Sequence, residues 1–270
     1  MPWTDANGVS LYYELVGTGA RLLVVSGTGS DLRERPRVSD GLLAEQFEVL
    51  AYDQRGLGQS SVPALPYAMV DFADDAAALL DALGWDDCFV IGISFGGMVA
   101  QEIAIRHPER VRRLVLACTS SGGAGGASYP LHKLFELNPD ERSAVRLQLI
   151  DTRWDEAWQR VYPQMVSLLS ERMRLDDEGE VPPGLTNQLA ARAEHDTADR
   201  LGSISCPTLV CGGRFDGIAP PVNSEFLARA IPDARLELFD GGHGFFMQDA
   251  AALPAIIAFL SAGAPGHDAP

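Results

Sequence analysis

Short apolar runs alternate with longer amphipathic stretches along most of the chain. One early segment, residues 10–16, alternates apolar and polar side chains, as a half-buried strand does. Further short runs are rich in apolar and often β-branched residues, at 22–26, 47–52, 88–93, 114–118, 208–211 and 235–239. Runs of this kind are typical of strands buried on both faces of a parallel sheet. The last run alternates, which predicts a strand nearer the edge.

Amphipathic segments between these runs predict helices. Residues 70–83 place their apolar side chains on one face. Residues 95–106 follow a predicted strand directly and end before Pro108, because a proline stops a helix. Two more helices are predicted near the end of the chain, at 221–230 and 250–262. Alternation of strands and helices favours an α/β domain with a mostly parallel sheet.

One stretch breaks the alternation. A loop rich in Gly and Ser at 119–128 leads into residues 129–201, which contain no convincing strand pattern. Helical patterns occur there at 140–150, 155–172 and 185–200. Roughly 70 residues without a strand are too many for a plain crossover. We therefore predict that 129–201 form a helical lid over the carboxyl edge of the sheet, where ligands bind in open α/β folds. The core domain is then 1–128 and 202–262, and the small, polar tail at 263–270 is predicted to be disordered.

Composition and charge narrow the range of partners. Apolar residues make up 46% of the chain and charged residues 21%, as in a globular protein. Because 37 Asp and Glu outnumber 21 Lys and Arg, the net charge is −16. This charge repels phosphate backbones and anionic membrane surfaces, so neither nucleic acid nor a membrane is an expected partner. No apolar run reaches the about 18 residues of a membrane span.

The cysteines and the first residues of the chain indicate the cellular compartment in which the protein is expected. No two of the four cysteines form a C-x-x-C pair, which favours buried, reduced thiols. The first residues lack the basic region and apolar core of a secretory signal. We therefore expect a cytoplasmic protein. No cluster of Cys, His and carboxylates has the spacing of metal ligands, so no metal and no other cofactor is expected.

The sharpest chemical signal is the sequence GISFG at 92–96, which follows a predicted strand and opens a predicted helix. Its Ser94 is therefore expected on a tight strand-to-helix turn, with glycines where side chains would collide. The turn exposes the hydroxyl at a helix N-terminus, where backbone N–H groups favour negative charge. This context predicts a nucleophilic serine; the alternative is a serine that merely caps the helix.

A nucleophilic serine needs a base, and the base needs a group that orients it. Of the five histidines, only His243 lies in a glycine-rich loop just after a late strand, in GGHG at 241–244. Asp216, in GRFDG at 213–217, follows an earlier strand and is the candidate acid. Asp240 is a rival acid, but the loop from it to His243 is short. The predicted catalytic residues are therefore Ser94, Asp216 and His243.

The order Ser94, Asp216, His243 is that of the α/β-hydrolase superfamily. The chain resembles this family over nearly its whole length, through the segments at 92–97, 213–217 and 241–243 and YDQRGLGQS at 52–60. The motifs look most like the small lidded esterases, including enol-lactonase-like and cofactor-free haloperoxidase-like members. The resemblance implies an eight-stranded, mostly parallel sheet flanked by helices, with a helical lid inserted after the sixth strand.

The resemblance also implies an oxyanion hole. The family takes one N–H donor from the residue after the nucleophile, here Phe95, and the other from the loop after the third strand, here Thr28. In that loop Ser26 stands where the family usually has histidine, which leaves the hydrogen bonding of the loop open. The aromatic residues Trp154, Trp158, Phe215 and Phe245 are candidates to line an apolar pocket, although lid packing is the alternative for the tryptophans.

These residues predict a serine hydrolase that cleaves a small-molecule ester or lactone with an apolar part, through an acyl-enzyme intermediate. One alternative is a carbon–carbon bond hydrolase or lyase with the same three residues. Another is a non-catalytic small-molecule receptor of the same fold. Arginines at 33, 35 and 37 either contact a substrate carboxylate or form a solvated face, which the charge pattern favours. The oligomeric state stays open, with a homo-oligomer as one alternative.

Overall fold

Strands of the computed structural model form one eight-stranded sheet, in the order β1-β2-β4-β3-β5-β6-β7-β8. The structure describes residues 2–35, 37–64, 66–169 and 181–262. The strands are β1 (Trp3–Ala6), β2 (Val9–Val16), β3 (Ala20–Val25), β4 (Phe47–Tyr52), β5 (Cys88–Ile93), β6 (Val111–Ala117), β7 (Thr208–Gly213) and β8 (Ala234–Phe239). β2 pairs antiparallel with β1 and β4, and all other neighbours pair in parallel. The predicted mostly parallel sheet is confirmed.

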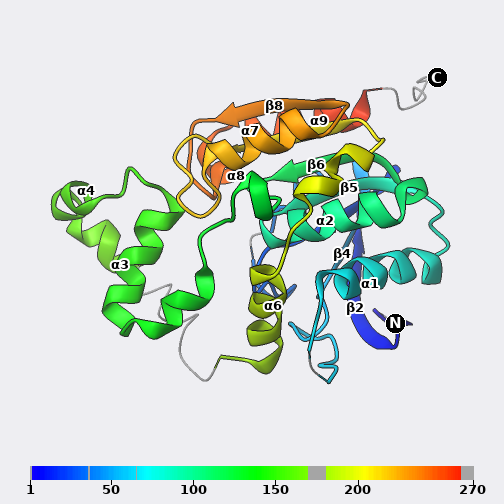
Figure 1. Cartoon of the computed structure of the whole chain (residues 1–270), viewed down its shortest axis with the longest axis horizontal. Helices are drawn as coiled ribbons and strands as arrows, with labels where there is room; N and C mark the ends of the chain where they lie inside the picture. The colour runs from blue at the N-terminus through cyan, green and yellow to red at the C-terminus, as the bar shows by residue number, and fades with distance from the viewer. Residues whose placement is uncertain (1, 36, 65, 170–180, 263–270) are drawn as a thin grey trace.

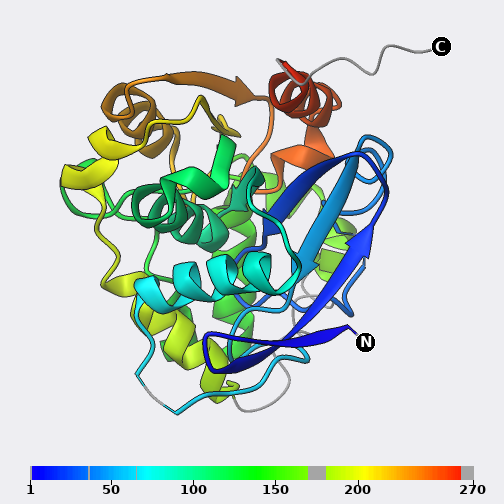
Figure 2. The same ribbon diagram turned by 90° about the vertical axis from the view of Figure 1, so that its right-hand side faces the viewer.

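Side chains that alternate along the central strands divide the core into two layers. In β3, Leu23 and Val25 belong to one buried cluster, whereas Leu22 and Val24 belong to the other. The helices that flank the sheet are α1 (Met69–Ala82), α2 (Phe95–Arg106), α7 (Pro221–Ala230), α8 (Phe245–Gln248) and α9 (Ala252–Ser261). The first three contribute to the first cluster, and α8 and α9 contribute to the second, so the helices lie on both faces (Figures 1 and 2). Burial on both faces explains why the central strands are continuous apolar runs.

Helices also fill the segment between β6 and β7. Among the described residues of this segment, the helices include α3 (Pro139–Ile150), α4 (Glu156–Val161) and α6 (Pro183–Ala193). Short 3₁₀ helices occur at η1 (Pro108–Arg110), η2 (Gly123–Gly125), η3 (Leu131–Glu136) and η4 (Ala198–Ser203). Figure 1 shows α3 and α4 projecting to one side of the molecule, beyond the edge of the sheet. We call residues 129–201 the lid segment.

Two predicted helices of the lid segment are shorter than expected. The prediction of one helix over 155–172 is wrong, because α4 ends at Val161, just before Tyr162 and Pro163, and a new helical stretch covers 163–169. Residues 170–172 lie outside the described residues, as does the predicted tail at 263–270. The prediction of one helix over 185–200 is also wrong. There α6 ends at Ala193, and Thr197 donates its N–H to the carbonyl of Ser121, in the loop that precedes the lid segment.

Two smaller observations complete the fold. Within the described residues, no helix is both long enough and apolar enough to cross a membrane. All four cysteines, Cys88, Cys118, Cys206 and Cys211, are free and buried, as predicted.

Candidate active site

The turn between β5 and α2 holds Ser94 in a strained conformation. Its φ of 55° lies in the left-handed region, which residues with side chains rarely adopt. A Cβ on Gly96 would lie 2.0 Å from the Val25 carbonyl oxygen, and a Cβ on Gly92 would lie 2.4 Å from the Gly96 carbonyl oxygen. Only glycine fits at either position. The Thr119 hydroxyl donates to the Ser94 carbonyl at 2.7 Å and ties the turn to the end of β6.

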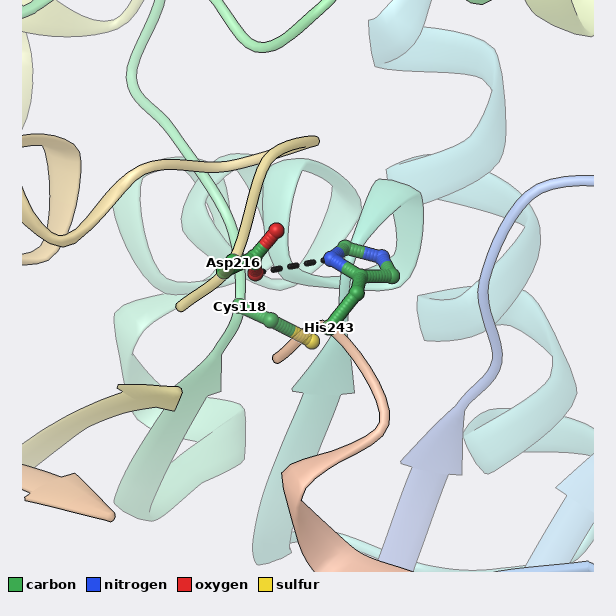
Figure 3. A group of neighbouring side chains, drawn as sticks. All are labelled: Cys118, Asp216 and His243. Carbon is green, nitrogen blue, oxygen red and sulfur yellow. Dashed lines mark hydrogen bonds and ion pairs between the residues drawn. The ribbon is translucent and has the colours of Figure 1, made fainter. Parts of the chain in front are cut away.

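His243 connects the serine to a buried carboxylate. Its Nε2 lies 3.0 Å from Ser94 Oγ. Its Nδ1 lies 2.8 Å from Asp216 Oδ2, and Figure 3 shows this second contact. The other carboxylate oxygen of Asp216 accepts the N–H groups of Ile218 and Ala219, both at 2.8 Å. With Nδ1–H donating to the carboxylate, Nε2 accepts the serine proton. The structure thus brings together the three residues predicted from three separate strand ends.

The loop that carries His243 is held against the lid segment. The His243 N–H donates to the carbonyl of Ile150, the last residue of α3, at 2.6 Å. A Cβ on Gly242 would lie only 1.9 Å from the same oxygen. The glycine before the histidine therefore allows α3 to approach the loop, and α3 is fixed relative to the imidazole.

The other carboxylates near these loops have different partners. Asp240 accepts a hydrogen bond from Arg153 at 3.0 Å and its side chain is 72% exposed, so it does not orient the imidazole. Asp53 accepts the N–H groups of Leu32 at 2.7 Å and Gln59 at 2.8 Å. Burial raises the pKa of Asp53, and these two hydrogen bonds act against that rise. Its role is to join two loops beside the site.

The loop after β3 packs directly on the serine turn. A Cβ on Gly27 would be 3.5 Å from the Ser94 Cβ, and the next residue, Thr28, lines the same cavity as Ser94. The Ser26 carbonyl accepts a hydrogen bond from Gln54 Nε2 at 2.8 Å. The Gly29 N–H donates to Gln188 of α6 at 2.9 Å. The side chains of Gln54 and Gln188 therefore hydrogen-bond to the loop on either side of Thr28.

A cavity of about 510 Å³ opens over Ser94 and His243. Its wall is apolar where the lid segment covers it, through Leu131, Leu134, Phe135, Leu149, Ile150, Leu185 and Leu189. The loop at 27–30 and Ile218 also line the cavity. The charged residues Glu34, Arg142 and Arg146 also line it. A hydroxyl, an imidazole and a buried carboxylate at the floor of a cavity can activate the hydroxyl for attack on a carbonyl carbon.

Comparison with known proteins shows the family of the chain. The model of the alpha/beta hydrolase fold family matches residues 21–250. The chain belongs to the alpha/beta hydrolase fold family. This hydrolase family accounts for the sheet order, the flanking helices and the position of the lid segment after the sixth strand.

Relatives of this hydrolase differ in the bond they cleave. A poly(3-hydroxyalkanoate) depolymerase of Ectopseudomonas oleovorans is 33% identical over 88% of this chain and 83% of its own length. RutD of Azorhizobium caulinodans, named as a proposed carbamate hydrolase, is 31% identical over 91% of this chain and 92% of its own. A 2-hydroxymuconate semialdehyde hydrolase of Pseudomonas putida is 30% identical over 83% and 80%. The enol-lactonase structure from Burkholderia xenovorans LB400 shares the fold, with a TM-score of 0.78 at 24% identity over 96% of this chain and 100% of that one.

The aromatic residues expected in the pocket of this hydrolase do not line its cavity, and that prediction is corrected. Trp154 and Trp158 stack on each other with ring centroids 5.5 Å apart. Phe245 is fully buried and stacks on Phe239 in the core. The Phe215 ring lies under the Arg153 guanidinium, 4.3 Å from its centroid. The leucines of η3 and α6 line the cavity instead, and their spacing of three and four residues was the available signal.

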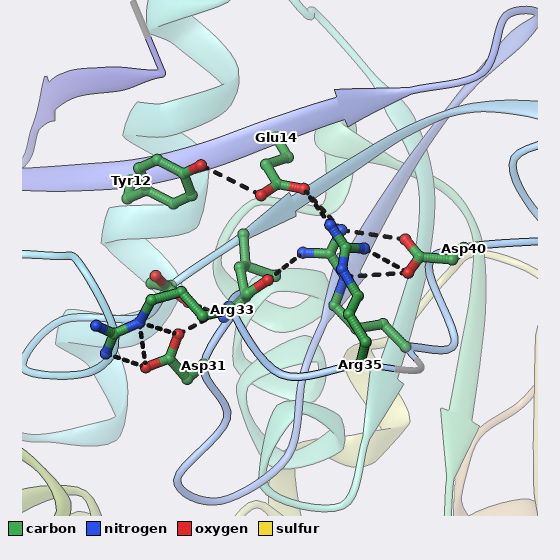
Figure 4. Close-up of polar contacts among 9 residues, drawn as sticks. Tyr12, Glu14, Asp31, Arg33, Arg35 and Asp40 are labelled. Atoms are coloured by element: carbon green, nitrogen blue, oxygen red, sulfur yellow. Dashed lines mark hydrogen bonds and ion pairs between the residues drawn. The ribbon is translucent and has the colours of Figure 1, made fainter.

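The arginines at 33, 35 and 37 contact acidic residues of the protein. Figure 4 shows Arg33 and Arg35 beside their acidic partners. Arg33 forms an ion pair with Asp31. Arg35 and Arg37 both contact Asp40 and Glu14. These contacts hold the pKa values of Asp31, Asp40 and Glu14 below their usual range, against the opposing effect of burial. The run therefore forms a network of surface ion pairs.

Cys118 lies beside the His243 and Asp216 pair (Figure 3). Ligand atoms of these three residues lie within 4.8 Å of one another, which is close enough for a metal ion. However, burial raises the pKa of the Cys118 thiol well above its ordinary value, so the thiol stays protonated. Both ring nitrogens of His243 already have partners. Cys118 is therefore a buried thiol that packs beside the hydrogen-bonded pair of His243 and Asp216.

Proposed function

We propose that this hydrolase cleaves a carboxylic ester or lactone through an acyl-enzyme intermediate. The observation that supports the proposal is the continuous line of hydrogen bonds from Ser94 Oγ through His243 to Asp216 at the floor of the cavity. The relative named as a poly(3-hydroxyalkanoate) depolymerase acts on a polyester by its name, which favours ester chemistry.

The proposed reaction has two halves. Ser94 Oγ attacks the carbonyl carbon while His243 Nε2 takes the hydroxyl proton, and Asp216 stabilises the imidazolium that forms. The negative oxygen faces the backbone N–H groups of Phe95 and Thr28, each such donor being worth several kcal/mol in reactions of this kind. As the carbonyl re-forms, the bond to the alcohol oxygen breaks and that oxygen takes the proton from Nε2. A water molecule then attacks the acyl carbon while His243 Nε2 takes one of its protons. As the bond between the acyl carbon and Ser94 Oγ breaks, Nε2 gives that proton to Oγ and the acid is released.

The cavity indicates the general shape of the substrate. Its leucine-lined wall suits an apolar part of the acyl or alcohol group, because burying apolar surface contributes about 25 cal/mol per Å². Its volume of about 510 Å³ is in the range of small-molecule pockets. A small ester or lactone with an apolar part is therefore the proposed substrate class.

A panel of substrates tests this proposal. We expect p-nitrophenyl esters of graded acyl length, or one of a set of lactones, to be hydrolysed by the wild-type protein and not by Ser94→Ala. If none of these is cleaved while a vinylogous diketone is, the ester proposal is wrong and carbon–carbon bond hydrolysis is favoured.

Carbon–carbon bond hydrolysis is the second candidate because the relative from Pseudomonas putida is named as a 2-hydroxymuconate semialdehyde hydrolase. The same three residues could serve it. A non-catalytic receptor is less well supported, since a receptor has no need of a complete relay. Tight binding of a small ligand with no turnover of either panel would favour the receptor.

A further inference from the structure

A second cavity, of about 160 Å³, lies between the loop after β6 and the end of α6. Polar residues from this loop, from η3 and from α6 with the turn after it line the cavity: Ser120, Ser128, His132, Arg192 and His195. None of the described residues lines both this cavity and the one over Ser94. The part of the lining that the structure describes holds polar and basic side chains but no acidic one.

Main-chain contacts hold the walls of this second cavity in place. Gly122, in the loop after β6, and Asp196, after α6, form an isolated antiparallel bridge. A Cβ on Gly122 would lie only 1.8 Å from the His195 carbonyl oxygen, and the φ of Gly122 is 69°. Only glycine allows the two segments to approach this closely. The walls are therefore fixed relative to each other in the folded chain.

Arg192 places a buried positive charge at this cavity. The residue is only 7% exposed. Its terminal nitrogens donate to the Tyr129 carbonyl at 2.8 Å and to Ser128 Oγ at 2.6 Å, and both acceptors are neutral. Because Ser128 lines the cavity, its hydrogen bond holds the guanidinium at the cavity wall. Burial lowers the pKa of Arg192 to about 10, so the group is still charged at pH 7.

The positive charge of Arg192 has no negative partner in the described part of the chain. Burial is the cause of its pKa shift, with no contribution from a carboxylate. Charged side chains are rarely buried without a partner of opposite charge, because taking a charge out of water costs free energy. A small anion in the cavity supplies the missing charge.

Hydrogen-bonding groups around the cavity are also left without partners. The two bonds to Tyr129 and Ser128 use two of the five N–H groups of the guanidinium, and Arg192 Nε has no partner. Ser120 Oγ and both ring nitrogens of His195 lack partners as well. The Ser120 carbonyl lies near enough to this ring to affect its pKa, but it forms no hydrogen bond of good geometry with it. These groups match a ligand that accepts several hydrogen bonds.

We propose that the second cavity binds a small oxyanion, a carboxylate or a phosphate, and that Arg192 is its main ligand. The volume equals about five water molecules at about 30 Å³ each, which suits inorganic phosphate or acetate. Gly123, Ala127 and His132 also line the cavity and are exposed, so an ion can enter from solvent. Guanidinium groups form strong charged hydrogen bonds with such oxyanions. The site is independent of the bond cleaved at Ser94.

An anion titration tests the proposal. Inorganic phosphate and acetate are each added to the wild-type chain at pH 7.5 and constant ionic strength, with sodium chloride as the reference salt. Calorimetry measures the affinity, and proton NMR follows the ring signals of His195, which are assigned with His195→Phe. We expect at least one oxyanion to bind with a Kd of about 1 mM or below and to shift these signals, while chloride does not. Phosphate alone, acetate alone or both then identify the kind of oxyanion. Responses no larger than those to chloride overturn the proposal and indicate a cavity that holds water only.

Variants locate the binding. Arg192→Met should weaken the Kd by about tenfold or more and remove the shift of the His195 signals. Arg229→Met removes an arginine of α7 whose side chain is 67% exposed, and it should leave the Kd unchanged. If Arg192→Met does not fold, Ser120→Ala takes its place, with an expected weakening of about threefold. Wild-type affinity in the variant that folds overturns the proposal. Ester cleavage is not measured here, so failure of the proposed ester chemistry leaves this test valid.

Discussion

The buried side chain of His195 should make the folded protein less stable in mild acid, by an amount that follows from its pKa. It lies in the lid segment between α6 and η4, and only 5% of its surface is exposed. Burial lowers its pKa from 6.5 to about 4. Nearby Arg200 adds to the lowering, whereas Glu102, Asp196 and the Ser120 carbonyl oppose it. The ring is therefore neutral in the folded protein at pH 7 and stays neutral under mildly acidic conditions.

The direction in which pH changes the free energy of unfolding follows from which state, folded or unfolded, binds a proton on His195 at the higher pH. Between pH 6.5 and about 4 the unfolded chain holds a proton on this residue that the folded protein does not. Acid therefore favours the unfolded state, and the loss of stability begins as the pH falls through 6.5 and ends near the folded pKa. Each pH unit in that window costs up to about 1.4 kcal/mol, so a fall to pH 5 costs about 2 kcal/mol.

Urea unfolding followed by tryptophan fluorescence at pH 7.5 and pH 5.0 measures this cost, and both values stay above the pI of about 4.6. His195→Phe removes the titrating group, and His195→Gln is the alternative if the larger ring does not pack. The carboxylates titrate in the wild type and in the variant alike. Their contribution to the loss of stability therefore cancels when the loss in the variant is subtracted from the loss in the wild type. We expect the wild type to lose about 2 kcal/mol more than the variant between the two pH values. Equal losses would refute the argument.

Two further predictions concern the serine turn and its acid. Asp216→Asn should lower kcat by about 10³- to 10⁴-fold in steady-state kinetics, because the imidazole loses its orienting carboxylate. As the control, Asp240→Asn should keep kcat within about twofold of the wild type. Similar losses of kcat in both variants would contradict the assignment of Asp216 as the acid. Gly96→Ala should unfold at a much lower temperature or fail to fold, because its Cβ would lie 2.0 Å from the Val25 carbonyl oxygen, whereas Gly202→Ala meets nothing within 4 Å and should leave Tm nearly unchanged. A normal Tm for Gly96→Ala in thermal unfolding would refute the packing argument.

The sequence predicted most of the sheet because its strands are buried on both faces and end at small or polar residues. The strands at 47–52 and 88–93 have their predicted bounds, and so does the helix at 95–106. β1 was not visible in the pattern because only Ala6 of its four residues is buried. A short edge strand of this kind is stabilised by its partner, and its own sequence carries little signal.

Ser94 and His243 could be predicted because each depends on a local requirement of the backbone. Ser94 needs glycines where the turn folds back, and His243 needs a glycine where α3 approaches its loop. The lining of the cavity could not be predicted in the same way, since the direction of a side chain in the lid depends on contacts made far along the chain. Trp158 has the spacing of a pocket residue, but its ring stacks on the ring of Trp154. Pro163 indicates the end of a helix, but the helical pattern on both sides of it led to the prediction of one helix over 155–172.

The central claim is that His243 activates Ser94 as a nucleophile, and covalent labelling tests it most directly. The protein is incubated with a fluorophosphonate, and its intact mass and the modified peptide are measured. We expect one adduct per wild-type chain, located on Ser94, no adduct on Ser94→Ala, and labelling of His243→Ala slower by about 10²-fold or more. An adduct on another residue of the wild type, or labelling of His243→Ala at the wild-type rate, would contradict the claim.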